Sequence, residues 1–189
     1  MFRAVIFDVD GTLVDSNDAH ASAWVQAITE SGRRVEFSRV RPLIGMGGDK
    51  LLPELTGLSI DSPQGKAIVA RRREIFQRNY LPHLKPTRGA QPLLEWLRDD
   101  RKKLVVASSA EDEELQQLLE VAGASKLIES STSSDDAARS KPDPDIVAAA
   151  IGRTGVPAAG AVAVYADPAD LLEHYDLSLF KRPLPARSA

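Results

Sequence analysis

Short apolar runs separated by helix-forming stretches extend along most of the chain. Four runs are predicted to form strands, and they cover residues 4–7, 103–107, 126–129 and 161–165. The first run, residues 4–7, is wholly apolar, as expected of a strand that is buried on both faces. Because helical stretches separate the runs, the pattern predicts an α/β fold with a parallel, doubly wound sheet.

The stretch between the first two strands is almost wholly helical. The helices predicted there cover residues 18–31, 49–55 and 63–80. A further helix at 90–98 leads back to the sheet. We therefore predict a helical cap domain over residues 16–83, inserted into an α/β core that consists of residues 1–15 and 84–189.

The alternation continues beyond the second strand. The acidic stretch 111–114 opens a helix, where negative side chains favour the positive helix end, and Gly123 closes it. The remaining predictions are a polar loop at 130–140, helices at 142–153 and 168–175, and a loose tail at 183–189.

Two aspartates stand at the end of the first strand. Asp8 and Asp10 are two residues apart, so their side chains leave the strand on the same side, and Gly11-Thr12 marks where the strand stops. The carboxyl ends of strands are where ligands bind in open α/β sheets. Two carboxylates there repel each other unless a cation or a shared proton relieves the repulsion. The pair indicates either a metal site with acid/base chemistry or a solvated acidic turn.

Composition narrows the class of protein. The chain has 189 residues, of which 43% are hydrophobic and 27% charged, which suits one medium α/β domain with room for a small second one. The absence of cysteine excludes disulfides, thiolate zinc sites and a cysteine nucleophile. A net charge of -3 gives no reason to expect nucleic-acid binding. The N-terminal apolar run is too short for a signal peptide or a membrane span, so we expect a soluble, cytoplasmic protein.

The run Asp8-Val9-Asp10-Gly11-Thr12 resembles the first motif of the haloacid dehalogenase superfamily, in the branch that acts on phosphate esters. The resemblance implies that Asp8 is a nucleophile that forms an aspartyl-phosphate, and that Asp10 protonates the leaving oxygen and then activates water. It also implies magnesium (Mg2+) bound by Asp8 and by the carbonyl of Asp10, with phosphate contacts from Gly11 and Thr12. Magnesium would mask the negative charge of a carboxylate that attacks a phosphate dianion.

Two further motifs follow in the order typical of that superfamily. Ser108 and Ser109 come directly after the second strand, where a hydroxyl and adjacent backbone N–H groups can bind a phosphoryl oxygen. Two serines after a strand are also common as a turn or a helix cap. Lys141 precedes Pro142-Asp143-Pro144-Asp145 and resembles the lysine that stabilises the transferred phosphoryl group. An isolated Lys-Pro would instead be a surface lysine before a helix.

The predicted cap carries candidate substrate contacts. Helical-cap members of the superfamily often have a histidine where this chain has His20, which would assist proton transfer near Asp10 or pack at the cap hinge. The Gly-rich loop before residue 50 resembles the cap loop that closes over substrate, and its candidate contacts are Arg41, Gly47 and Lys50.

A run of three arginines lies on the third predicted cap helix. Arg71-Arg72-Arg73 covers too much of the helix circumference to form one stripe, so we predict a solvated face rather than an anion site.

The superfamily's fourth motif is not intact in this chain. That motif is a strand followed by Gly-Asp, with another acid about four residues later, and its acids complete the magnesium site. The candidate here has Ala166 in place of glycine, then Asp167 and, one residue early, Asp170. Two alternatives stay open. The motif is degraded and Asp167 binds the metal, or the core lacks one βα unit because too few residues follow Lys141.

These features predict a magnesium-dependent phosphatase that hydrolyses a small phosphorylated metabolite. A sugar phosphomutase of the β-phosphoglucomutase type, which uses the same aspartyl-phosphate, is the first alternative. The second is a catalytically impaired relic that binds a phosphorylated ligand or a partner protein, as the damaged fourth motif suggests. The sequence predicts neither the identity of the substrate nor the oligomeric state.

Overall fold

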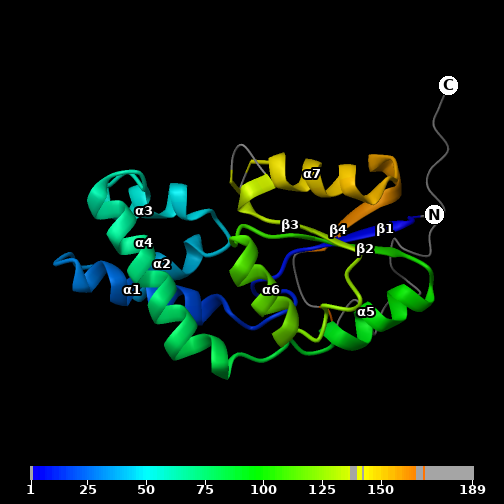
Figure 1. The fold of residues 1–189 in the computed structure, drawn as a ribbon, viewed down its shortest axis with the longest axis horizontal. Helices are drawn as coiled ribbons and strands as arrows, with labels where there is room; N and C mark the ends of the chain where they lie inside the picture. Colours follow the sequence, from blue (N-terminus) through cyan, green and yellow to red (C-terminus); the bar gives the residue numbers. More distant parts are fainter. Residues whose placement is uncertain (1, 137–139, 142, 165–167, 169–189) are drawn as a thin grey trace.

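Four parallel strands form the sheet in the part of the chain that the structure describes (Figure 1). A computed structural model of the chain describes residues 2–136, 140–141, 143–164 and 168. The strands are β1 (Ala4–Phe7), β2 (Lys103–Ala107), β3 (Ser130–Thr132) and β4 (Ala161–Val164). They lie in the order β3-β2-β1-β4, and every pair is parallel. This arrangement confirms the predicted parallel α/β sheet.

The two central strands are buried on both faces. The helices that cover these faces are α5 (Ala90–Asp99), α6 (Asp112–Val121) and α7 (Asp145–Thr154). Phe7 and Val106 pack into the larger core, together with the leucines of α5 and α6. Ile6 and Val105 point to the other face and pack against α7. Successive strand residues alternate between faces, so an unbroken apolar run is what a sheet covered on both sides requires.

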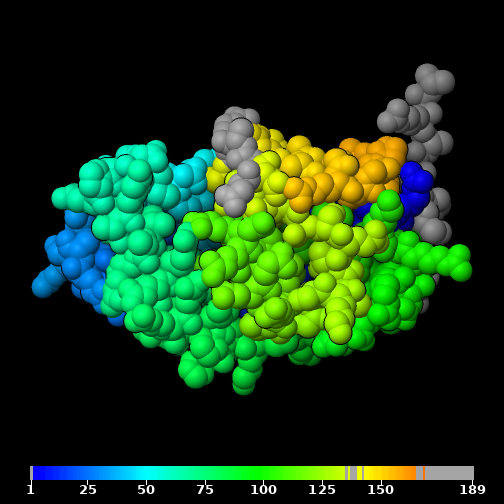
Figure 2. All heavy atoms as spheres, viewed as in Figure 1, coloured from blue at the N-terminus to red at the C-terminus, as the bar shows by residue number. Residues whose placement is uncertain are grey.

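The chain between β1 and α5 forms a group of helices beyond one end of the sheet (Figure 1). They are α1 (Asn17–Glu30), α2 (Phe37–Val40), α3 (Gly48–Thr56) and α4 (Pro63–Ile75). Where the sequence predicted one helix to residue 80, α4 continues as a π-helix (Phe76–Tyr80). Single 3₁₀ turns occur at Arg41–Leu43, Leu81–His83, Ser134–Asp136 and Ala158–Gly160. In the space-filling view, the side chains of α4 abut the green side chains of the core (Figure 2).

The structure corrects the third predicted strand. Residues 125–127 form a turn, and the N–H groups of Leu127 and Ile128 both donate to the carbonyl of Ala124. Their apolar side chains pack against the core without any strand pairing. The Glu129 N–H is the first to donate to β2, at the carbonyl of Leu104 (2.9 Å). The polar residues Ser130–Thr132 pair with β2 instead, because backbone hydrogen bonds form a strand whatever the side chains are.

The predicted helix at 168–175 and the tail at 183–189 lie outside the described residues, apart from Pro168. Within the described part, no helix combines the length and the apolar character that crossing a membrane requires.

Candidate active site

The carboxyl ends of β1 and β2 meet at one edge of the sheet, and Asp8 and Ser108 follow them directly. The Asp8 N–H donates to the carbonyl of Val164 in β4 (3.0 Å), and the Ser108 N–H donates to the carbonyl of Thr132 in β3 (3.0 Å). Asp8 and Ser108 are therefore bonded to a neighbouring strand through their backbone N–H groups, directly after β1 and β2 end. Because β1 and β2 are parallel and in register, Asp8 and Ser108 lie at the same edge.

Lys141 joins these two strand ends. Its Nζ donates to Asp8 Oδ1 (2.6 Å) and to the carbonyl of Ala107 (2.9 Å). Burial raises the pKa of the Asp8 carboxyl, and the negative charge of Asp10 adds to that effect, although the Lys141 ammonium opposes both. A buried carboxylate beside a second one is a place where further positive charge is stabilising.

A tight turn follows β1. Gly11 has φ +73°, in the left-handed region, and a Cβ there would collide with the side chain of Asn17. Thr12 is fully buried, and its Oγ1 has no hydrogen-bond partner among the described residues. The turn therefore requires glycine, and it leaves an unsatisfied hydroxyl at a position where the sequence predicted a phosphate contact.

Asp10 accepts two hydrogen bonds on one oxygen. The Ser16 hydroxyl (2.5 Å) and His20 Nε2 (2.8 Å) both contact Asp10 Oδ1. Burial by itself would raise the pKa of the Asp10 carboxyl, but the interactions with His20 and Ser16 and the positive charge of Arg72 outweigh it and lower the pKa to about 2. Asp10 is therefore ionised in this arrangement.

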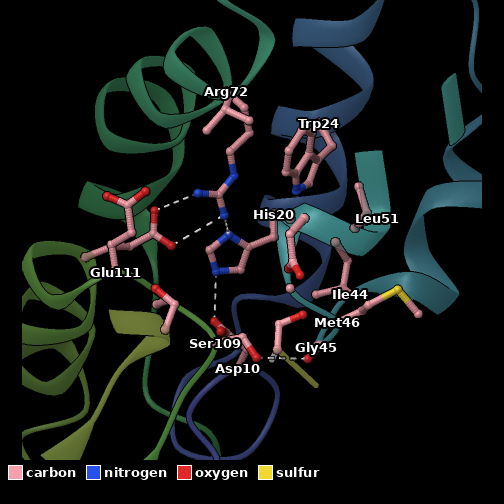
Figure 3. A pocket seen from close by; sticks show the side chains of 18 of the residues that line it. Asp10, His20, Trp24, Ile44, Gly45, Met46, Leu51, Arg72, Ser109 and Glu111 are labelled. Carbon is pink, nitrogen blue, oxygen red and sulfur yellow. Dashed lines mark hydrogen bonds and ion pairs between the residues drawn. The ribbon is translucent and has the colours of Figure 1, made fainter. Parts of the chain in front are cut away.

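His20 connects Asp10 to helix α4. Its Nδ1 lies 2.5 Å from Nη2 of Arg72, and its ring stacks on Phe76 with the centroids 4.0 Å apart. A guanidinium group only donates hydrogen bonds, so Nδ1 accepts and the ring proton lies on Nε2, facing Asp10. Arg72 Nη1 in turn lies 2.8 Å from Oε2 of Glu114 in α6. A chain of polar contacts thus runs from the strand edge through α1 and α4 to α6 (Figure 3).

Arg72 corrects the prediction that Arg71-Arg72-Arg73 forms a solvated face. The side chain of Arg71 is 41% exposed, but that of Arg72 is only 16% exposed. Successive helical residues point about 100° apart, so α4 turns one arginine of the run inward. Sequence reasoning missed both Arg72 and Glu114. A signal existed for Arg72, since it follows the buried Ile68 by four residues and shares its face of α4.

A cavity of about 350 Å³ opens beside Asp10, between helices α1, α3 and α4 and the core (Figure 3). Trp24, Met46 and Leu51 contribute an apolar wall, and Glu111 lies across from them. An acid/base group at the base of a cavity with one apolar wall can act on a bound small molecule.

The predicted phosphate and loop residues Ser109 and Gly47 both line this cavity. The Ser109 hydroxyl donates to the carbonyl of Gly45 (3.3 Å), which ties the loop before α3 to the end of β2. The Ser108 hydroxyl accepts from the N–H of Ala110 (3.1 Å), as the turn alternative for the two serines expects.

Arg41 and Lys50 are not among the described residues that line the cavity. Arg41 forms an ion pair with Asp18 on the surface. Lys50 donates to the carbonyl of Ser140 (2.7 Å) and pairs with Asp143, so it links α3 to the segment that carries Lys141.

The donor atoms at the strand edge fit magnesium. This ion prefers carboxylate and carbonyl oxygens and accepts water in its remaining positions, and Asp8 and Asp10 supply such oxygens. No group of three or more His, Cys, Asp or Glu side chains that could bind a metal occurs within the described residues. Asp167 and Asp170 lie outside the described residues. The strand that pairs with β1 on that side is β4, which ends at Val164. Both alternatives for the fourth motif stay predictions.

The fold and the site define a class of protein. It is a parallel α/β protein with a partly buried carboxylate pair and a lysine at the strand edge, next to a cavity that helices α1, α3 and α4 help to line. The chain belongs to the haloacid dehalogenase-like hydrolase family, whose model matches residues 5–172.

Solved structures show the same fold. A hydrolase from Pseudomonas syringae is 25% identical with a TM-score of 0.84, over 93% of this chain and 98% of that one. CbbY from Rhodobacter sphaeroides, solved in complex with phosphate, is 23% identical with a TM-score of 0.72, over 86% of this chain and 77% of that one.

One curated relative is similar in sequence. "Probable phosphatase IndB" from Dickeya dadantii (strain 3937) is 32% identical over 79 residues, which are 41% of this chain. The match spans 34% of the length of that relative.

Proposed function

We propose that this chain is a magnesium-dependent phosphatase that hydrolyses a small phosphorylated metabolite through an aspartyl-phosphate on Asp8. The observation that carries the proposal is the contact of Asp8 Oδ1 with Lys141 Nζ, at 2.6 Å. Asp8 also precedes the ionised Asp10 by only two residues. A carboxylate nucleophile, a cation and an acid/base group at one edge are what phosphoryl transfer requires. Membership of the family and the phosphatase among the relatives support the same function.

The first half-reaction forms the covalent intermediate. A carboxylate oxygen of Asp8 attacks phosphorus, and the bond between phosphorus and the ester oxygen breaks. Asp10 gives a proton to the departing oxygen. The phosphate dianion beside Asp10 raises the pKa of this carboxyl, which favours proton uptake before the bond breaks. Lys141 stabilises the negative charge of the transferred group.

The second half-reaction restores the enzyme. Asp10, now ionised, takes a proton from the water that attacks the phosphorus of the aspartyl-phosphate, and the bond to Asp8 breaks with release of phosphate. Ser16 and His20 both contact Oδ1 of Asp10, so we assign the proton transfers to Oδ2. These two contacts orient the carboxylate through both steps.

Magnesium, when bound, would screen the negative charge between Asp8 and the phosphoryl group. The Asp8 carboxylate and the Asp10 carbonyl would bind it, and Asp167 is a candidate for a further ligand. We assign residues 16–83 to a cap that excludes water from the cavity, because α1, α3 and α4 all contribute to its lining.

Hydrolysis of 4-nitrophenyl phosphate tests the proposal. We expect release of nitrophenol that requires added magnesium, stops on chelation and is abolished in Asp8→Asn. The matched control is Asp15→Asn, since Asp15 is exposed and undergoes the same change in charge seven residues away. Equal phosphate release by the wild type and Asp8→Asn would refute the assignment of the nucleophile.

Two further measurements on the same purified protein distinguish the phosphatase from the two alternative functions. Interconversion of sugar phosphates faster than phosphate release would identify a phosphomutase. Binding of inorganic phosphate without magnesium-dependent turnover would identify an inactive binding protein.

A further inference from the structure

The cavity beside Asp10 carries more negative than positive charge. The carboxylates in its described lining are Asp10, Asp49, Glu111 and Glu114. The guanidinium groups there belong to Arg72 and Arg73, and both are already paired, Arg72 with Glu114 and Arg73 with Glu111. A second anion on a substrate would therefore meet a surplus of negative charge, and no guanidinium group of the described lining is without a carboxylate partner.

The positive charge that suits the phosphoryl group lies at a different place. Lys141 contacts Asp8 at the strand edge and is not among the described residues that line the cavity. A phosphate ester would bind with its phosphorus at Asp8 and its ester oxygen within reach of Asp10. The rest of the leaving group then extends into the cavity. The charges of the cavity lining therefore act on the leaving group and not on the phosphoryl group.

The wall across from Glu111 is apolar (Figure 3). Trp24, Ile44, Met46 and Leu51 lie on this wall, and Ile60 and Val69 are further apolar residues of the lining. A volume of about 350 Å³ is at the small end of ligand cavities, so a leaving group of modest size would touch both walls. An apolar body with an uncharged or positive end fits these two walls best.

We propose that the cavity selects phosphate monoesters whose leaving group has an apolar part and an uncharged or positively charged end. Esters whose leaving group carries a second anion, such as a carboxylate or another phosphate, are disfavoured. This inference rests on the proposed phosphatase function and names the substrate class of the same site.

Three phenyl phosphates test the selection. Their para substituents are 2-aminoethyl, carbamoylmethyl and carboxymethyl. The last two differ in charge but are nearly equal in size, and the methylene group next to the ring keeps the phenol a similar leaving group in all three. We expect kcat/KM in the order cation, neutral, anion, with the anionic ester roughly tenfold or more below the neutral one. Added salt should reduce the difference, because it screens charges in an open cavity.

A change at Glu111 should alter the selection. Glu111→Gln removes one lining carboxylate and leaves the Arg73 guanidinium without its carboxylate partner. The Arg73 and Glu111 side chains are 38% and 51% exposed, so loss of this pair should cost the fold little. We expect the ratio of kcat/KM for the anionic ester to that for the neutral ester to rise several-fold. The matched control is Glu120→Gln, which makes the same change at an exposed position of α6 away from the cavity lining and should leave the ratio unchanged.

Calorimetric binding of the three corresponding benzylphosphonates separates this inference from the proposed function. If the phosphonates bind in the expected order but no ester is hydrolysed, the phosphatase proposal fails and the selection stands. If the esters are hydrolysed and the anionic one is as good as the neutral one, the selection is wrong and the phosphatase proposal stands. Failure of all three phosphonates to bind would overturn the selection.

Discussion

Replacing Glu114 with glutamine tests whether the polar chain from Asp10 to α6 holds the helical insertion against the core. The Arg72 and Glu114 side chains are 16% and 7% exposed, and their charged atoms lie 2.8 Å apart. The variant keeps the shape of the side chain but leaves the Arg72 guanidinium without its carboxylate. Removal of one partner from a buried ion pair costs about 3–5 kcal/mol. Arg72 keeps its contact with His20, so we expect the lower end, about 3 kcal/mol.

Thermal and urea unfolding measure this loss. In a protein of this size, a change of 1 kcal/mol in the free energy of unfolding shifts the melting temperature by about 2–4 °C, so Glu114→Gln should melt about 6–12 °C lower. The matched control is Glu74→Gln on α4. The Glu74 side chain is 39% exposed and pairs with Arg71 and Arg78, which are 41% and 75% exposed, so loss of its charge should change the melting temperature little.

A double replacement extends the test. Arg72→Met combined with Glu114→Leu leaves neither charge buried. The double variant should therefore lose less free energy of unfolding than the sum of the losses in the two single variants. Melting of Glu114→Gln at the same temperature as Glu74→Gln would refute the reasoning, because the pair would then behave like an exposed one.

Three further replacements have defined outcomes. The folded-state pKa of Asp10 is about 2, against an ordinary value of 3.8, so this carboxylate contributes stability that is present above about pH 4 and lost as the pH falls toward 2. Urea unfolding at several pH values should show that Asp10→Asn has a lower free energy of unfolding than the wild type near neutrality, by on the order of 2 kcal/mol. Between about pH 4 and 2 the stability of the variant should depend less on pH than that of the wild type. An equal dependence on pH in both proteins would contradict this. Phe76 is fully buried and stacks on His20, so Phe76→Ala should lower the free energy of unfolding by about 3–5 kcal/mol, and a loss below 1 kcal/mol would show that the ring is not part of the core. Lys141→Met should reduce kcat for 4-nitrophenyl phosphate by roughly a hundredfold, since it removes the cation at Asp8, and unchanged turnover would exclude Lys141 from phosphoryl transfer.

Local patterns along the chain were sufficient for much of the fold. The apolar runs at β1 and β2 predicted buried strands, because a parallel strand covered on both faces needs apolar side chains at every position. The same patterns placed Asp8 and Ser108 directly after these strands, and parallel pairing alone then puts them at one edge. The strand at Ser130–Thr132 escaped prediction because its serines carry no apolar signal and its stability comes from hydrogen bonds to β2.

The contacts around Asp10 depend on how distant helices are oriented. His20, Arg72 and Glu114 come from three helices, and no local periodicity states that α4 turns Arg72 toward α1 and α6 rather than toward water. The sequence by itself determined the chemistry at the strand edge, because strand period and motif spacing are local properties. Only the tertiary structure decided the charge balance of the cavity, because its two ion pairs, Arg72–Glu114 and Arg73–Glu111, join residues more than thirty positions apart.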